Sequence, residues 1–253
     1  MALKKEGKMA KFFVDAKDIG ENTIRITDAE DRKHMTKVLR LGIGDTISIS
    51  DSVKFEYETE IVAIEKDYIE ARIVDMQNFA REPELKVTLF QGVPKQGKME
   101  TIIQKNVELG VFSIVPVFTD RTVVVDHGGF HKKIDRWQKI ADEAVKQCKR
   151  GIIPQIQREI TFKNMLKELD RYDLILFPYE NEDDRTIKDC LRNLAVKPQT
   201  VAVIIGPEGG FSNQEAEALI ETGAESVSLG KTILRTETAG MAAIAMTMYE
   251  LEL

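Results

Sequence analysis

Two glycine-bearing segments hold the residue types most suited to ligand chemistry. Residues 206–212 read GPEGGFS, and residues 229–239 read LGKTILRTETA. Glycine lacks a Cβ atom, so Gly209 and Gly210 can adopt positive φ angles and present consecutive N–H groups to an anionic or polar group. We expect a positive φ at Gly209 in particular. Because Glu208 stands inside this turn, the first segment predicts a ligand-binding loop.

The second segment has an apolar half and a polar half. Leu229, Ile233 and Leu234 can wall a slot for a flat ring, with backbone polar groups reading the edge of that ring. The polar half is typical of a capped helix start, with threonines for the N-cap and Glu237 in the first turn. A helix N-terminus disfavours a cation, so this interpretation leaves Arg235 unexplained and indicates a separate role for it.

Both segments also have simpler interpretations, a tight strand-to-helix turn and an ordinary helix cap. Neither matches the dinucleotide pattern GxGxxG or the P-loop pattern GxxxxGK[ST], so a standard nucleotide site is not supported. A nucleotide-binding enzyme that holds phosphate on residues 206–210 stays as an alternative, and it predicts competition by ATP.

Alternating strands and helices must position these segments. From about residue 86, apolar runs alternate with amphipathic helical runs, which predicts an α/β domain with a largely parallel sheet. The expected strands cover residues 86–92, 113–118, 173–177, 200–205 and 226–229. The expected helices include residues 185–194, 213–222 and 237–251. Ligands of such sheets bind beyond the carboxyl ends of the strands, where both glycine-bearing segments fall.

The first part of the chain has a different periodicity. Between about residues 12 and 75, apolar and polar residues alternate, which is typical of half-buried strands. The expected strands cover residues 23–26, 46–50, 57–64 and 68–74, and a helix is expected over residues 29–41. A small β-barrel or sandwich fits this pattern, and the polar stretch at residues 77–84 marks its end.

The net charge of −6 excludes a protein coated uniformly with basic residues. The basic residues nonetheless gather in three clusters. These are Arg32, Lys33, His34, Lys37 and Arg40; Lys95 and Lys98; and Lys132, Lys133, Arg136, Lys139, Lys146, Lys149 and Arg150. One such cluster is more often a solvated face, but three in an acidic chain indicate a localised anionic partner.

Composition indicates a soluble globular protein, with 43% hydrophobic and 31% charged residues. No apolar run approaches bilayer length, and no signal peptide follows the lysine-rich start. The two cysteines, Cys148 and Cys190, form no metal-ligand pattern with the three histidines. We therefore expect a cytoplasmic protein with no membrane segment and no metal. Residues 1–8 are either native or an added extension.

Together, the two glycine-bearing segments closely resemble the signature segments of the ribosomal RNA small-subunit methyltransferase E family. These are the 16S rRNA uracil-N3 methyltransferases of the SPOUT superfamily. Other parts of the chain share the pattern: FFV at 12–14, KNVELGV at 105–111, Arg121, QC at 147–148, Arg150 and Pro154. The resemblance covers nearly the whole chain from about Lys11, and it is the combination of motifs that is specific.

This resemblance implies two domains. A PUA-like RNA-binding β-barrel would occupy residues 9–78, and a SPOUT α/β methyltransferase domain would occupy residues 79–253. The second domain would contain a deep C-terminal trefoil knot within about residues 200–253, which periodicity cannot predict because knots are rare. The family also implies a homodimer with cofactor sites near the subunit interface.

The resemblance further implies S-adenosylmethionine as the methyl donor, with S-adenosylhomocysteine as the product. The implied donor site consists of Leu176, Phe177, Pro178, Gly206, Pro207, Glu208, Gly209, Gly210, Leu229, Gly230, Ile233 and Leu234. The catalytic candidates are Arg235, Glu208, Glu237 and Arg121. The candidate RNA contacts are Arg32, Lys33, Lys37, Arg40, Lys95, Lys98 and Arg150.

The implied reaction carries the sulfonium methyl in line to N3 of a uridine in the decoding region of 16S rRNA, within the 30S subunit. Neutral N3 is a poor nucleophile, so the enzyme must favour the uracil anion with a base, or with a cation and N–H groups. Arg235 is the first candidate for the cation. Glu208 and Glu237 are candidates for the base or for orienting groups, and Arg121 for reaching RNA or the partner subunit's catalytic centre.

Two further alternatives stay open beside this interpretation and the nucleotide-binding enzyme. Another knotted methyltransferase, acting on a ribose 2′-hydroxyl or on a guanine of transfer RNA, would use the same cofactor cleft. An RNA-binding assembly factor that has lost catalysis would keep the fold without affinity for S-adenosylmethionine. The identity of the methylated product separates the first alternative, and donor binding separates the second.

Overall fold

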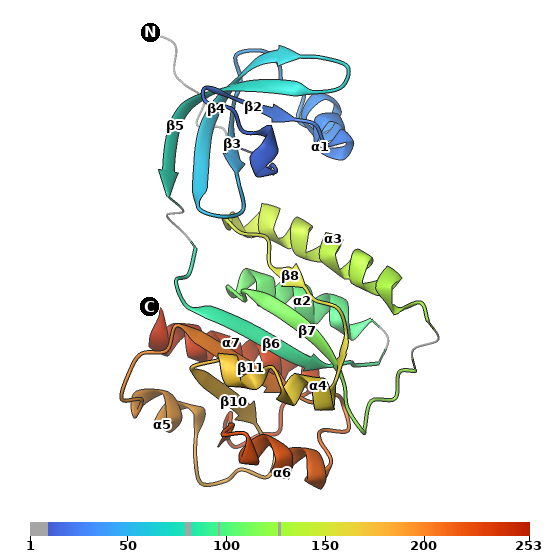
Figure 1. Ribbon diagram of the computed structural model, residues 1–253, viewed down its shortest axis with the longest axis vertical. Coiled ribbons are helices and arrows are strands. Elements are labelled where there is room, and N and C mark those ends of the chain that lie inside the picture. Colours follow the sequence, from blue (N-terminus) through green and yellow to red (C-terminus); the bar gives the residue numbers. More distant parts are fainter. Residues whose placement is uncertain (1–9, 79–81, 96, 126–127) are drawn as a thin grey trace. The chain divides into compact units, whose positions relative to one another are not determined.

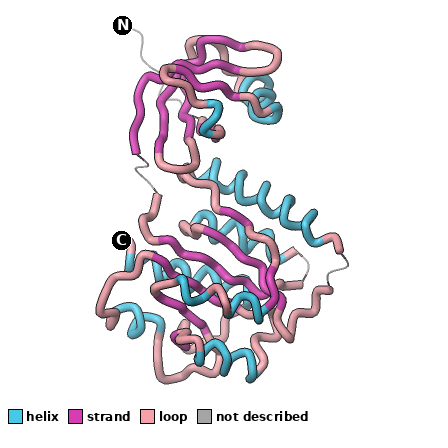
Figure 2. Tube along the Cα trace, in the orientation of Figure 1, coloured by secondary structure: helices cyan, strands magenta, loops and turns pink. Residues whose placement is uncertain are grey.

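A computed structural model describes residues 10–78, 82–95, 97–125 and 128–253 (Figures 1 and 2). The chain divides into two compact units. One contains the described residues up to Glu82 together with Lys146–Ile153, and the other contains the described residues of Pro83–Val145 and Pro154–Leu253. The expected extension at residues 1–8 and the expected boundary after residue 78 fall on residues outside those described.

The first unit is built on five strands of the described chain. They are β1 (Lys11–Phe13), β2 (Thr23–Ile26), β3 (Thr46–Ser50), β4 (Phe55–Ile64) and β5 (Ile69–Asn78). They pair in the order β1-β3-β4-β5-β2, with β1 parallel to β3 and the other pairs antiparallel. The predictions for β2 and β3 are confirmed, because the alternating residues Ile24, Ile47 and Ile49 are fully buried in the core of this unit.

One helical segment crosses the first unit. A short 3-10 helix, η1 (Ala16–Asp18), precedes it, and α1 (Ala29–Lys33) begins after Asp28, whose side chain accepts a hydrogen bond from the Asp31 N–H at 2.8 Å. The helix continues as a π-helical turn, η2 (His34–Val38), and buries Met35. Arg40 follows with a φ of 54°, a left-handed conformation that cannot continue a helix.

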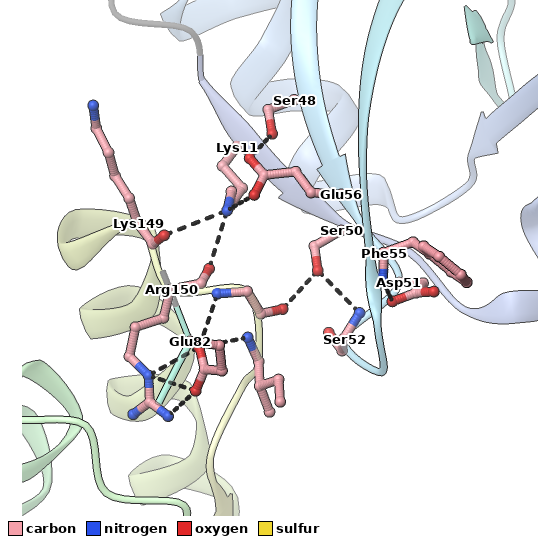
Figure 3. A network of polar contacts seen from close by, with 12 residues as sticks. Lys11, Ser48, Ser50, Asp51, Ser52, Phe55, Glu56, Glu82, Lys149 and Arg150 are labelled. Carbon is pink, nitrogen blue, oxygen red and sulfur yellow. Dashed lines mark hydrogen bonds and ion pairs between the residues drawn. The ribbon is translucent and has the colours of Figure 1, made fainter. Parts of the chain in front are cut away.

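A buried ion pair fastens residues 146–153 to the rest of the first unit (Figure 3). The side chains of Arg150 and Glu82 are 6% and 8% exposed, and Arg150 Nε donates to Glu82 Oε1 at 3.1 Å. The Gly151 N–H donates to Glu82 Oε2 at 3.1 Å. Ser50 Oγ donates to the Gly151 carbonyl at 2.6 Å, and Lys11 Nζ donates to the Arg150 carbonyl at 3.3 Å. The guanidinium of Arg150, a predicted RNA contact, is thus buried against Glu82 in this structure and does not face solvent.

Removing one partner of this ion pair takes a close, buried counterion away from the other, which is strongly destabilising. We expect Glu82→Ala to lower the free energy of unfolding by about 3–5 kcal/mol. Glu60→Ala is the matched control, because Glu60 pairs with Arg72 at the surface and such pairs contribute about 0–1 kcal/mol. Urea denaturation followed by circular dichroism measures both variants. Equal losses in the two variants would contradict the assignment.

The second unit is an α/β fold with a parallel sheet. Its strands are β6 (Lys86–Gly92), β7 (Ser113–Phe118), β8 (Gln155–Ile156), β9 (Ile160–Thr161), β10 (Leu174–Pro178), β11 (Thr200–Ile205) and β12 (Glu225–Val227). The described strands pair in the order β12-β10-β11-β6-β7-β8, and β9 also pairs with β7. Every pairing is parallel. The predicted parallel sheet is confirmed.

Helices cover both faces of this sheet (Figures 1 and 2). They are α2 (Lys98–Glu108), α3 (Phe130–Cys148), α4 (Phe162–Leu166), η3 (Leu169–Arg171), α5 (Ile187–Arg192), α6 (Asn213–Glu221) and α7 (Thr236–Leu251). α7 packs against α2, α5, β6 and β11. On the opposite face, Phe90 of β6 packs in one cluster with Met165 of α4 and Leu219 of α6. This arrangement puts α7 beneath the centre of the sheet, although it follows the edge strand β12.

Several predicted elements differ at their ends from those observed, and two of them show a local cause. The strand expected at residues 226–229 is β12, which ends at Val227, because Ser228 forms an isolated bridge to Thr186 instead. The helix expected from residue 185 begins at Ile187, after a cap in which the Thr186 side chain accepts from the Asp189 N–H.

In the described part of the chain, no helix is long and apolar enough to cross a membrane, and no cluster of three potential metal ligands occurs.

Candidate active site

A cavity of about 960 Å³ lies where β10, β11 and β12 end. This volume falls in the range of small-molecule sites. Its wall comes from residues 178–180, 182, 183 and 186, from residues 205–211 and 228–236, and from Lys98 and Ala239. Both glycine-bearing segments therefore face the same space, at the carboxyl edge of a parallel sheet where ligands of such folds bind.

The first glycine-bearing segment is a tight turn between β11 and α6. The Gly210 N–H donates to the Pro207 carbonyl at 2.9 Å, and Gly210 has a φ of +66°. The positive φ predicted for Gly209 is therefore wrong by one residue. Ser212 and Glu215 form the capping box that opens α6, with each side chain accepting from the other residue's N–H.

The turn after β7 supports this loop from outside. Arg121 Nη1 donates to the Gly209 carbonyl at 2.8 Å, and Ser212 Oγ donates to Asp120 Oδ2 at 2.8 Å. The Asp120 N–H donates to Glu215 Oε1 at 2.8 Å. Arg121, a predicted catalytic residue, thus braces the glycine turn of its own chain.

Thr236 joins the two glycine-bearing segments. Its hydroxyl donates to the Gly206 carbonyl at 2.6 Å and accepts from Gln91 Nε2 at 2.9 Å. Both Thr236 and Gln91 are buried. A side chain from the first turn of α7 therefore fixes the start of the first loop.

Replacing Thr236 with valine keeps the shape but removes both hydrogen bonds. The Gly206 carbonyl would then lose the hydroxyl that donates to it, and Gln91 Nε2 would keep only its hydrogen bond to the Gly92 carbonyl. A polar group left without its partner costs about 1–3 kcal/mol. We expect Thr236→Val to lower the unfolding free energy by at least about 1 kcal/mol, and to weaken ligand binding in the cavity. Thr247→Val on the same helix is the control, because the Thr247 hydroxyl only donates to the Ala243 carbonyl. Comparable ligand affinity in both variants, measured by calorimetry, would contradict the role of Thr236 in holding the first loop.

Lys98 stands between two glutamates at the wall of the cavity. Lys98 Nζ lies 3.1 Å from Glu208 Oε1 and 3.2 Å from Glu237 Oε2. The Lys95 N–H also donates to Glu208 Oε1 at 3.1 Å. Lys98 and Glu208 line the cavity, whereas Glu237 is not among the lining residues. Lys98, which the sequence suggested as an RNA contact, is paired inside the site.

The pKa values of both glutamates are shifted by these contacts. Burial raises the pKa of Glu208, but its own N–H, Lys98 and the Lys95 N–H together hold that pKa below the usual range. The pKa of Glu237 is lowered by its own N–H, by Lys98 and by the charge of Arg235, against an opposing effect of burial. Both carboxylates are therefore ionised at neutral pH.

Most of the predicted donor-site residues lie together in this cavity. Pro178, Gly206, Pro207, Glu208, Gly209, Gly210, Leu229, Gly230, Ile233 and Leu234 line it, and so does Arg235. Leu176 and Phe177 do not, because both are fully buried in the core. Phe177 instead supports the wall by stacking on Tyr179, with ring centroids 5.0 Å apart.

Sequence reasoning missed the wall that follows β10. The lining residues that follow β10 are Tyr179, Glu180, Glu182, Asp183 and Thr186. A signal was present, since residues 179–186 directly follow a predicted strand and share the ligand-binding edge of the sheet. The sequence alone did not show which ligand these acidic residues could bind.

The predicted RNA contacts of the first unit lie on its helical segment. Lys33, Lys37 and Arg40 are exposed, as is Lys95 in the second unit. Arg32 is half-buried, and its Nε donates to the Thr27 carbonyl at 3.3 Å. Four of the seven predicted RNA contacts are thus free to meet a partner at the surface.

Comparisons with known proteins agree with this division of the chain. Residues 81–248 match the family model of an RNA methyltransferase domain, and residues 26–74 match that of an RNA methyltransferase PUA domain. The chain is 31% identical to the ribosomal RNA small subunit methyltransferase E of Bacillus subtilis, over 97% of this chain and 98% of that protein.

Two similar solved structures contain a methyl donor. One is a ribosomal RNA small subunit methyltransferase E from Neisseria gonorrhoeae bound to S-adenosyl methionine, 30% identical with a TM-score of 0.82. The alignment covers 95% of this chain and 97% of that one. The other is a methyltransferase from Legionella pneumophila in complex with the cofactor, also 30% identical with a TM-score of 0.82, over 96% and 98% of the two chains.

Proposed function

The chain belongs to the ribosomal RNA small subunit methyltransferase E family, and we propose that it methylates N3 of a uridine in 16S ribosomal RNA. It is an S-adenosylmethionine-dependent rRNA methyltransferase. The observation that carries the proposal is the cavity between the two glycine-bearing loops, in a fold shared with relatives crystallised with this donor. The N3 position of uracil is the finer part of the proposal, and it follows from the family resemblance.

The residues of the cavity suit a sulfonium donor. Leu229, Ile233 and Leu234 offer an apolar surface for adenine, and the backbone of residues 206–210 offers polar groups for its edge or for the ribose. A Cβ atom on Gly210 would lie 2.5 Å from Glu180 Oε1, so glycine lets this carboxylate approach the loop. When bound, the donor supplies an electrophilic methyl group to the acceptor nitrogen.

Arg235 is placed to stabilise the reacting uracil. It is the N-cap residue of α7, and its side chain is exposed at the cavity wall. Its carbonyl accepts from the Thr238 and Ala239 N–H groups at 2.8 Å, so the main chain holds the residue in place. A fixed cation beside a uracil carbonyl oxygen favours the N3 anion, which is the nucleophilic form.

Glu208 and Glu237 are poor candidates for the general base. A base that removes a proton from a weak acid works best with a pKa near the operating pH, and both carboxyls have pKa values below their usual range. Their oxygens are also engaged by Lys98. We therefore assign them to the architecture of the donor site, and assign activation of N3 to electrostatic stabilisation.

The first unit supplies backbone contacts to RNA in this proposal. The exposed side chains of Lys33 on α1, Lys37 on η2 and Arg40 just after η2 form a basic surface. Such cations bind phosphates and confer affinity without sequence information. The match of residues 26–74 to a PUA domain of RNA methyltransferases supports this role.

The finer points of fold and assembly are part of the same proposal. A closed PUA-like barrel, a trefoil knot within about residues 200–253 and a homodimer are expected of the family. The return of α7 from beyond the edge strand β12 to the sheet centre supports the knot. The substrate is the 16S rRNA of the 30S subunit, which places the enzyme in the cytoplasm.

The direct test is methyl transfer from labelled S-adenosylmethionine to 30S subunits from a strain that lacks this gene. We expect 3-methyluridine at one position of the 16S rRNA, identified by mass spectrometry of nucleosides. A ribose 2′-O-methyl product, or a methylguanosine in transfer RNA, would instead identify another knotted methyltransferase. Absence of both donor binding and transfer would favour the assembly factor.

A further inference from the structure

Lys98 connects three separate segments at the edge of the donor cavity. It is the first residue of α2, Glu208 belongs to the loop after β11, and Glu237 belongs to the first turn of α7. The side chains of Lys98, Glu208 and Glu237 are 30%, 25% and 21% exposed. The contact is thus partly shielded, which makes it stronger than a fully exposed surface pair.

The three side chains form a chain of contacts that runs from Glu237 through Lys98 to Glu208 at the cavity wall. Glu237 does not line the cavity, Lys98 lines it and holds Glu237, and Glu208 lines it and is held by Lys98. Among the described residues, the other cross-loop group that binds the Glu208 carboxylate is the Lys95 N–H. The position of the Glu208 carboxylate therefore depends on the ammonium, and the ammonium depends on Glu237.

We propose that Lys98 is a positioning residue of the methyl-donor site, which holds the Glu208 carboxylate against the cavity wall with Glu237 as its anchor. This inference rests on the proposed function. Lys98 itself does not touch the reacting atoms. Its loss leaves Glu208 and Glu237 facing each other without a cation between them, so the two carboxylates repel and the loop after β11 loosens.

Removing the ammonium also creates a pH dependence that the wild type lacks. Two adjacent carboxylates without a counterion cannot both stay ionised easily, so the pKa of one of them rises. The charged groups near the pair are Lys98 on α2, Arg235 at the start of α7 and, across the cavity, Glu180, Glu182, Asp183 and Lys231. With Lys98 gone, the charge of Arg235 still lowers the pKa of Glu237, but it is not among the groups that lower the pKa of Glu208.

The experiment measures the affinity for S-adenosylmethionine by calorimetry between pH 5.5 and 8. We expect Lys98→Met to weaken binding about tenfold at pH 8 and to recover part of the affinity as the pH falls, because protonation of one carboxylate relieves the repulsion, while the wild type stays nearly flat. Lys98→Arg should restore both the affinity and the flat profile. In Lys98→Met/Glu237→Gln the pH dependence should disappear although the affinity stays low, because one carboxylate of the pair is gone.

Lys105→Met is the matched control on the same helix, because Lys105 pairs with Glu108 at the surface by an i, i+3 contact. It should bind the donor like the wild type at every pH. A Lys98→Met profile that coincides with the wild type would overturn the inference, and so would a double variant that keeps the pH dependence. A wild-type protein that does not bind S-adenosylmethionine would instead overturn the proposed function, so the two failures are distinguishable.

Discussion

Replacing Arg235 with alanine is expected to lower the rate of methyl transfer by about 100-fold or more, while affinity for S-adenosylmethionine changes by less than about threefold. The reason is that the main chain and the side chain of Arg235 have different roles. Its carbonyl caps α7 through the main chain, which alanine preserves, whereas its side chain supplies a cation at the cavity wall. Loss of one preorganised electrostatic group typically costs 10²–10³ in turnover.

Single-turnover kinetics with 30S subunits measure this effect directly. Arg192→Ala is the control for removing an exposed arginine, because Arg192 pairs with Glu250 away from the cavity. Arg235→Lys keeps the charge but changes its geometry, and should recover part of the rate. Unchanged turnover in Arg235→Ala would remove Arg235 from the mechanism, and an equal loss of donor affinity would assign it to binding instead.

Replacing Gly92 with alanine is expected to weaken donor binding by about 30-fold or more, because no space exists for a side chain there. A Cβ atom on Gly92 would lie 2.5 Å from Pro207 Cδ and 2.8 Å from the Gly206 carbonyl carbon. These are atoms of the loop backbone and of a rigid ring, which cannot swing aside. The first glycine-bearing loop must therefore move away from the end of β6.

Gly129→Ala is the matched control, since a Cβ atom there meets no other atom within 4 Å and its φ is not positive. It should leave the affinity unchanged. Calorimetric titration with S-adenosylmethionine compares the two variants, and thermal unfolding reports whether the fold is retained. Wild-type affinity in Gly92→Ala would show that the position of this loop does not matter for the donor.

The sequence predicted elements well wherever one periodicity dominated. β6, β7 and β11 lie at the predicted residues, because each is an apolar run bounded by turn residues. The residues between 155 and 171 received no prediction, since β8, β9, α4 and η3 are too short for either period to emerge. Tertiary contacts with β7, rather than local pattern, define that region.

The sequence predicted which loops form the site, but it did not predict the contacts within those loops. Both glycine-bearing loops face one cavity, as expected of crossover loops at one sheet edge. The sequence could not show that Lys98 turns inward to two glutamates, because a basic residue near a helix start looks the same whether it faces solvent or a site. It also could not show that Arg150 is buried, because its partner Glu82 is far away in the sequence.

Gly209 and Gly210 show most clearly what the sequence could not predict. A pair of glycines indicates that one of them adopts a positive φ, but the choice depends on the hydrogen bonds of the turn. The Gly210 N–H bonds to the Pro207 carbonyl and gives the positive φ to Gly210. Gly209 is needed for a different reason, because a Cβ atom there would lie 3.2 Å from Cβ of Arg121.

The most direct test is a crystal structure of the protein grown with S-adenosylmethionine. We expect density for the donor between residues 206–210 and 229–234, with adenine against Leu229, Ile233 and Leu234 and the methyl group toward Arg235. Donor density at another place on the chain, or none at a saturating concentration, would contradict the account.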